Sequence, residues 1–130
     1  MANPNIVAVT TITGNTTYFA PTGTTAVVLL PNAASSNKVF KINQIVVSNG
    51  TASAANATVS IYTNGAQSQG SAPSGGTAFP VVNTVSVPAY SSLIAVDKTT
   101  AIYLQEGTSI SITSGTANAL TFSISYEDIS

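Results

Sequence analysis

The feature that most constrains the fold is a strict alternation of apolar and hydroxyl side chains near the C-terminus. Between residues 120 and 126, Leu, Phe, Ile and Tyr alternate with Thr and Ser. A period of two is typical of a β-strand that buries one face and exposes the other. A shorter alternation covers residues 109–113, and the turn-forming residues 114–118 separate the two runs. The pattern predicts an antiparallel hairpin.

Similar but weaker β patterns recur along the chain, with turn signals at roughly ten-residue intervals. Residues 26–30 are apolar at both even and odd positions, which face opposite sides of a strand, so they predict a central strand covered on both sides. Gly107 follows a strand and is expected in a tight turn with positive φ. These signals predict an all-β protein, a single antiparallel β-sandwich of jelly-roll or Greek-key type with about eight short strands. Before the hairpin, the segments with a β pattern are residues 5–12, 16–20, 26–30, 39–48, 57–62, 81–82, 84–87, 93–96 and 102–104, and the shortest of them are not counted as separate strands.

The 130 residues suffice for one domain with its own core, so we expect a single β-sandwich domain over residues 1–130. Residues 64–79 are rich in Gly, Ser and Gln and poor in apolar side chains, so burial cannot offset the entropy cost of ordering them. We expect an exposed flexible loop there. The opening residues lack the pattern of a signal peptide, and the longest apolar run is too short to cross a bilayer. We therefore expect synthesis in the cytoplasm and no membrane contact.

Charged side chains make up only 5% of the chain, against about 25% in a typical soluble domain. The three basic residues are all lysines and form no patch, so we expect no binding to nucleic acid. The formal net charge of −1 gives almost no repulsion between copies. The composition therefore favours a homo-oligomer or a subunit of a larger assembly.

The composition also excludes most catalytic and metal chemistry. Without His or Cys, the chain cannot form a Ser-His-Asp or Cys-His site or a zinc-thiolate site. Asp97 and Glu106 lie in turns that could meet at one end of the sandwich, as a carboxylate pair or with loop carbonyls around calcium. We interpret both as solvated turn residues. The prediction is a protein without enzymatic activity, catalytic residues, cofactor or metal.

Two tyrosines are the candidate ligand contacts. Tyr62 and Tyr90 border loops, where an aromatic ring can stack on a sugar. A tyrosine at a strand end is more often a rim residue whose hydroxyl faces water. A carbohydrate-binding module or adhesin that uses Tyr62, Tyr90 and the neighbouring loop is the alternative function.

Five stretches carry a family resemblance: residues 1–14, 32–43, 85–89, 102–110 and 125–130. They resemble small virion structural proteins of marine tailed bacteriophages, including those of cyanobacteria (cyanophages). The resemblance implies a non-enzymatic β-sandwich protein of the virion, made in the host cytoplasm, that decorates or cements the outer capsid surface as an oligomer, by preference a trimer. Its partners would be the major capsid protein or other virion proteins. A neck, tail or vertex position is the alternative.

Overall fold

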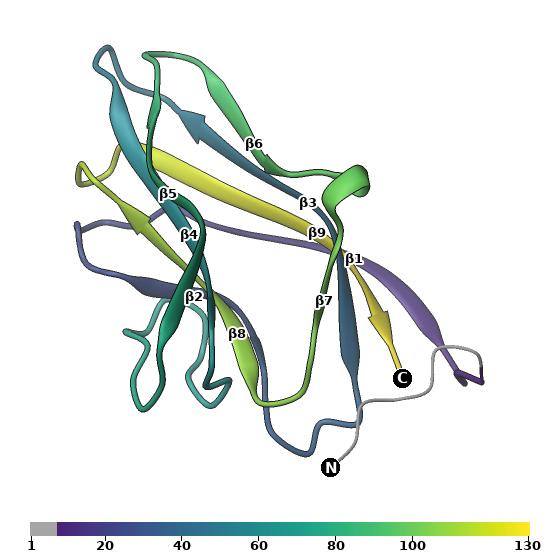
Figure 1. The fold of residues 1–130 in the computed structure, drawn as a ribbon. Helices are drawn as coiled ribbons and strands as arrows, with labels where there is room; N and C mark the ends of the chain where they lie inside the picture. The colour runs from purple at the N-terminus through teal and green to yellow at the C-terminus, as the bar shows by residue number, and fades with distance from the viewer. Residues whose placement is uncertain (1–7) are drawn as a thin grey trace.

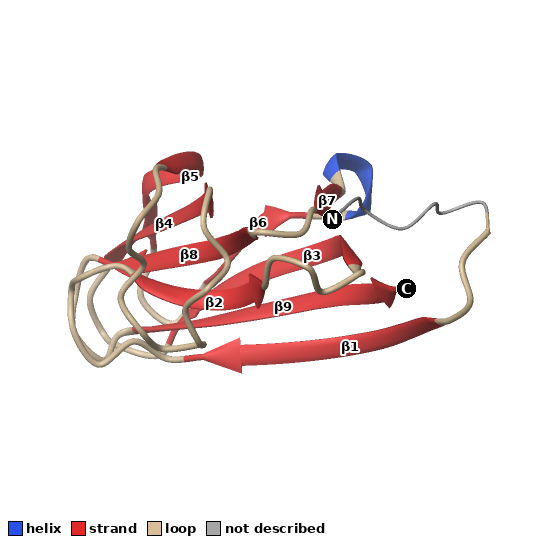
Figure 2. Ribbon diagram, turned by 90° about the horizontal axis from the view of Figure 1, so that it is seen from below, coloured by secondary structure: helices blue, strands red, loops and turns tan. Residues whose placement is uncertain are grey.

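The computed structural model describes residues 8–130, and these form β-strands and one 3-10 turn, η1 (Lys98–Thr100), without an α-helix. The strands pack as two antiparallel sheets, face to face (Figures 1 and 2). The nine strands are β1 (Ile12–Phe19), β2 (Val27–Asn32), β3 (Val39–Asn49), β4 (Ala55–Tyr62), β5 (Ala78–Val87), β6 (Ser92–Val96), β7 (Ile102–Leu104), β8 (Thr108–Ser114) and β9 (Leu120–Ile129).

The strand pairings are nested along the chain. β1 pairs with β9, β2 with β8, β3 with β6 and β7, and β4 with β5. This long ribbon is wrapped over itself, because β9 also pairs with β3 and β8 with β4. The result is sheet A, in the order β1-β9-β3-β6 with β7 also on β3, and sheet B, in the order β2-β8-β4-β5. With β6 and β7 taken as one strand interrupted by η1, this is an eight-stranded jelly roll, which confirms the predicted sandwich.

The predicted hairpin between the last two strands is wrong, because β8 belongs to sheet B and β9 to sheet A. Alternation specifies which face of a strand is buried but not which sheet the strand joins. Here the two apolar faces meet across the core, and residues 115–119 cross from one layer to the other. Five side chains predicted to be buried are buried, namely Ile110, Ile112, Leu120, Phe122 and Ile124, whereas Tyr126 is only partly buried. The predicted exposed face of β8 is wrong, because Ser109 and Ser111 are buried as well.

The beginning of the chain also differs from the prediction. Residues 5–7 of the first expected strand lie outside the described residues, and residues 8–11 form no strand. β1 runs unbroken from Ile12 to Phe19, through the Gly14-Asn15 pair that predicted a turn. Each β1 residue has a partner in β9, so pairing along the whole strand overrides the local turn preference.

β2 is an edge strand, which corrects the prediction of a central one, because it pairs with β8 alone. Residues 28–30 are all buried even so. One reason is that the loop between β4 and β5 covers the free edge of β2. Val28 donates its backbone N–H to the Ser71 carbonyl at 2.9 Å and accepts the Gly70 N–H at 2.8 Å. Two features therefore explain why even and odd positions are both apolar: the loop lies against Val28, and a register shift in the pairing with β8 brings both Leu29 and Leu30 into the core.

Further contacts hold the same loop against the body of the domain. The Gln69 amide donates to the Leu29 carbonyl at 2.9 Å and to the Thr17 hydroxyl at 3.0 Å. Gly65 is buried against a strand end. The loop ends at residue 77, since the last two residues of the expected range, 78–79, already belong to β5. The flexibility expected for residues 64–79 concerns motion and stays a prediction.

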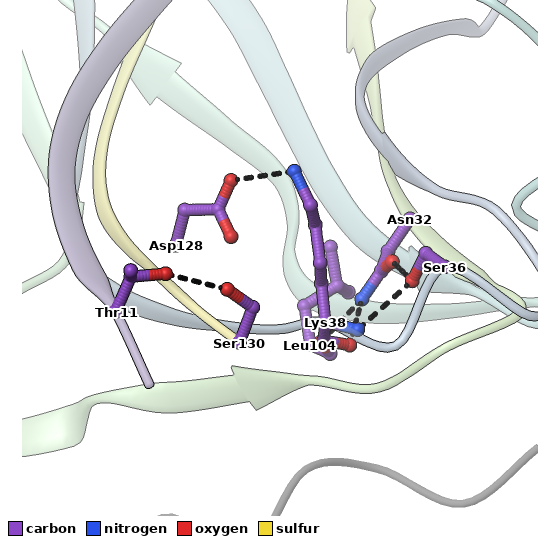
Figure 3. A network of polar contacts seen from close by, with 7 residues as sticks. All are labelled: Thr11, Asn32, Ser36, Lys38, Leu104, Asp128 and Ser130. Carbon is purple, nitrogen blue, oxygen red and sulfur yellow. Dashed lines mark hydrogen bonds and ion pairs between the residues drawn. The ribbon is translucent and has the colours of Figure 1, made fainter. Parts of the chain in front are cut away.

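Two buried asparagines link the sheets at opposite ends (Figure 3 shows the first). Asn32, at the end of β2, donates through Nδ2 to the Leu104 carbonyl of β7 at 3.0 Å. Asn49, at the end of β3, donates in the same way to the Val87 carbonyl of β5 at 3.0 Å. A buried amide with its hydrogen bonds satisfied stabilises the fold, whereas one left without partners would destabilise it.

The packing of Gly65 gives a stability prediction. A Cβ at this position would collide with the backbone carbonyl oxygens of Asn32 and Thr108. Overpacking of this kind typically costs about 1–3 kcal/mol. We expect Gly65→Ala to lower the free energy of unfolding by that amount, measured by urea denaturation. The control is Gly23→Ala, because nothing lies within 4 Å of a Cβ there; equal stability of the two variants would show that the loop does not pack against β2 and β8.

The alternation in β9 gives a second prediction. Phe122 is fully buried in the core, whereas its neighbour Ser123 is half-buried on the outer side. We expect Phe122→Ala to cost about 3–5 kcal/mol of unfolding free energy as a large-to-small core substitution. Ser123→Ala should change it by less than about 0.5 kcal/mol. Similar losses for both variants in chemical denaturation would mean that the buried face of β9 is assigned incorrectly.

Candidate functional site

The charged side chains are confined to one sheet and its ends. The four strands of sheet B contain none, and the chain has no charged residue between Lys41 and Asp97. Lys38, just before β3, forms an ion pair with Asp128 of β9 at 3.0 Å (Figure 3). The surface of the domain is therefore divided into a part with charges and a larger part without them. The charged residues are Lys38, Lys41, Asp97, Lys98, Glu106, Glu127 and Asp128.

Asp97 and Glu106 have separate local roles. The exposed Asp97 carboxylate caps η1 and accepts hydrogen bonds from the Thr99 hydroxyl and the Thr99 N–H. These bonds, the hydroxyl more than the N–H, lower the pKa of Asp97 below its ordinary value. Glu106 accepts the backbone N–H of Asn37 at 3.0 Å. Among residues 8–130, no group of three or more acidic, His or Cys side chains is arranged to hold a metal ion.

Near the Lys38–Asp128 pair, the phenol of Tyr126 is partly buried and packs against Phe40 with ring centroids 5.0 Å apart. This burial, followed by the nearby Asp128 carboxylate, raises the pKa of Tyr126 above its ordinary value. The phenol therefore stays protonated at neutral pH. The neutral phenol thus adds no charge beside the Lys38–Asp128 ion pair.

A polar hollow of about 410 Å³ opens on the outer face of sheet A. It lies beside a bulge in β3, where the register with β9 shifts between Ile42 and Gln44 and leaves Asn43 as the extra residue. The bulge also changes which positions of β3 face the core: Phe40 and Ile42 are buried before it, and Ile45 and Val47 after it. The residues that line the hollow are Asn43, Gln44, Asp97, Lys98 and Ser125.

The groups in the hollow are suited to hydrogen bonding. Asn43 donates through Nδ2 to Glu127 Oε2 at 3.0 Å, which holds its amide in place. Around it stand a second amide, a hydroxyl, a carboxylate and an ammonium group. These groups can bind a small polar molecule through hydrogen bonds. The sequence does not show this site, since a bulge arises from the pairing of two strands.

The structure does not bring Tyr62 and Tyr90 together. Tyr62 is 7% exposed, and its hydroxyl donates to the Gly76 carbonyl at 3.1 Å and accepts the Gly76 N–H at 3.0 Å. Tyr62 pairs with Ala78 at one end of sheet B, whereas Tyr90 follows the other end of β5 and is 74% exposed. Tyr62 thus anchors the loop, and of the two rings only that of Tyr90 faces solvent.

Exposed apolar side chains gather on one side of the sandwich, where β5 and β6 are the free edges of sheets B and A and contact each other. We call β5, residues 88–91 and β6 the open side. Of the eight large apolar residues that are exposed among those described, five lie there and three lie on β1 and β7. The five are Phe79, Val81, Val85, Tyr90 and Ile94. A run of sequence without charges was the only signal for this surface.

Comparisons with protein-family models, with curated proteins and with solved structures find no match for this chain. In the part of the chain that the structure describes, no helix is long and apolar enough to cross a membrane. The function is therefore inferred from the side chains and their arrangement. Their most distinctive features are the division of charge between the sheets, the polar hollow and the open side.

Proposed function

We propose that this protein is a non-enzymatic structural subunit of a bacteriophage particle, which decorates or cements the outer capsid surface as a homo-oligomer. The observation that carries the proposal is the division of the surface: sheet B and the open side lack charges, and the open side exposes apolar side chains. Exposed apolar surface of this kind is typical of a protein that docks on others. The resemblance in five stretches of sequence supports the phage particle as the setting.

Docking would be non-covalent. Burial of apolar surface gains about 25 cal/mol per Å², and a stable contact removes about 800 Å² per partner from water. A nearly uncharged surface loses little by desolvation, because few ions have to be stripped of water. The polar groups that do become buried are mostly hydroxyls, which can hydrogen-bond to a partner.

The amount of the protein in purified particles tests this function. We expect quantitative mass spectrometry of purified virions to find it in numbers comparable with the major capsid protein, because a decorating subunit repeats over the shell. A few copies per particle would assign it instead to the neck, tail or a vertex. Absence from purified particles would refute the proposal that it is a virion protein.

A polar ligand such as a glycan in the hollow is the second candidate function. The observation in its favour is the set of amide, hydroxyl, carboxylate and ammonium groups around an open space of about 410 Å³. Sugar hydroxyls both donate and accept hydrogen bonds, so they match this mixed lining. Tyr90 offers a separate exposed ring for stacking, away from the hollow.

Glycan arrays with three proteins test this candidate and locate the site. If the hollow binds, the signal of the wild type should be lost in Gln44→Ala and kept in Tyr90→Ala. The reverse pattern would assign binding to the Tyr90 ring. Gln44 and Tyr90 are both exposed, so neither substitution should disturb the fold. A wild-type array without signal would remove glycan binding as a function.

A further inference from the structure

The sheet edges come together on two sides of the sandwich, and the chain covers them on one side but not on the other. On the side of β1 and β2, the loop between β4 and β5 pairs with the edge of β2 and reaches β1. On the open side, no described segment pairs with the outer edges of β5 and β6. An edge strand with free N–H and C=O groups is a surface onto which other chains can add.

The open side lacks the most common protection of a sheet edge. Soluble proteins often place lysine or another charge on such a strand, and neither β5 nor β6 contains one. Instead, three apolar side chains of β5 and one of β6 are about 40% to 60% exposed. The four are Phe79, Val81, Val85 and Ile94.

Backbone pairing along β5 is nevertheless obstructed. Pro80 has no N–H to donate, and the register with β4 shifts twice, near Val81 and near Thr84. Thr84 has φ of 53°, and its N–H is already donated to the Thr58 hydroxyl at 2.9 Å. A bulged strand of this kind cannot extend a regular ladder. A partner on the open side must therefore contact side chains rather than continue sheet B.

We propose that the open side is the surface through which this chain associates with further copies of itself. The inference rests on the proposed function for its setting, a particle subunit that acts as an oligomer. In a closed oligomer, residues near the symmetry axis meet their own counterparts, so a charge placed there repels its copy. An uncharged apolar surface avoids this repulsion. Complementary charges commonly steer and orient a different partner, and the open side has none. Within the proposed particle we therefore assign the open side to contacts between copies and leave the uncharged sheet B for the shell.

The polar residues of the open side fit the same contact. The side chains between the apolar ones are Asn83, Thr84, Ser86 and Ser92, all exposed and neutral. Each can donate as well as accept a hydrogen bond, so it can pair with its own counterpart. The charges of sheet A lie outside this surface, so they remain hydrated when copies meet along β5 and β6.

Light scattering on purified protein, with single lysine substitutions, tests this surface. We expect the wild type to have a mass of at least twice the 13.1 kDa of one chain. Val85→Lys and Ile94→Lys should each raise the dissociation constant by at least about tenfold, because like charges would meet near the axis. Tyr18→Lys is the matched control: Tyr18 is 69% exposed but lies on β1, so association should be unchanged. Circular dichroism melts select the variants that remain folded.

Two results would overturn the inference: a wild type that stays monomeric up to about 1 mM, or folded Val85→Lys and Ile94→Lys variants that associate like the wild type. Loss of association in Tyr18→Lys alone would also overturn it by placing the contact on β1. The outcome separates from the proposed function. If the protein associates through β5 and β6 but is absent from particles, the inference stands and the proposed function is refuted. If it is a monomer but is present in particles, the inference is refuted and the proposed function stands.

Discussion

Burial of the two apolar sheet faces against each other is the interaction on which the rest of the structure depends. The chain has no cysteine and a single described ion pair, so cross-links and charges contribute little to its stability. The core takes buried side chains from every strand except β1, which adds only the partly buried Phe19, and Phe122, Ile42 and Leu29 are among the largest. This requirement explains why β8 and β9, similar in pattern and adjacent in sequence, lie in opposite sheets. The buried amides of Asn32 and Asn49 then fix how the sheet ends meet.

The sequence predicted those parts of the fold that depend on neighbouring residues. Alternation identified the buried face of β9, the length of β3 was nearly right, and Gly107 has φ of 75° in the expected turn. Features that depend on the partner of a strand could not be predicted. Gly14 lies inside β1 because β9 pairs along the whole strand, and residues 28–30 are all buried because a distant loop lies against Val28 while a register shift against β8 turns Leu29 and Leu30 into the core. Local patterns contain no information about which distant segment will provide that partner.

The candidate sites show the same limit. Tyr62 and Tyr90 were both selected because they border loops, yet the loop after β4 folds back onto the Tyr62 hydroxyl and leaves Tyr90 exposed. The polar hollow exists because β3 and β9 lose register at Asn43, and nothing in the local sequence marks that residue as a bulge. The absence of charge over residues 42–96 was visible from the start. The jelly-roll order places β5 and β6 at a common edge, so these uncharged residues form one surface that their order in the sequence does not predict.

The open side and the low charge have one physical explanation. A net charge of −1 gives almost no electrostatic repulsion between copies. Whether copies associate therefore depends on the side chains and strand edges that their surfaces expose. The chain uses a loop of more than ten residues to cover β2, and it interrupts β5 with Pro80 and two register shifts that oppose uncontrolled strand addition. These devices prevent open-ended sheet growth without making the β5 and β6 surface polar. A surface that opposes strand addition but permits side-chain contact at one edge fits the proposed subunit, which would assemble in a closed, specific way.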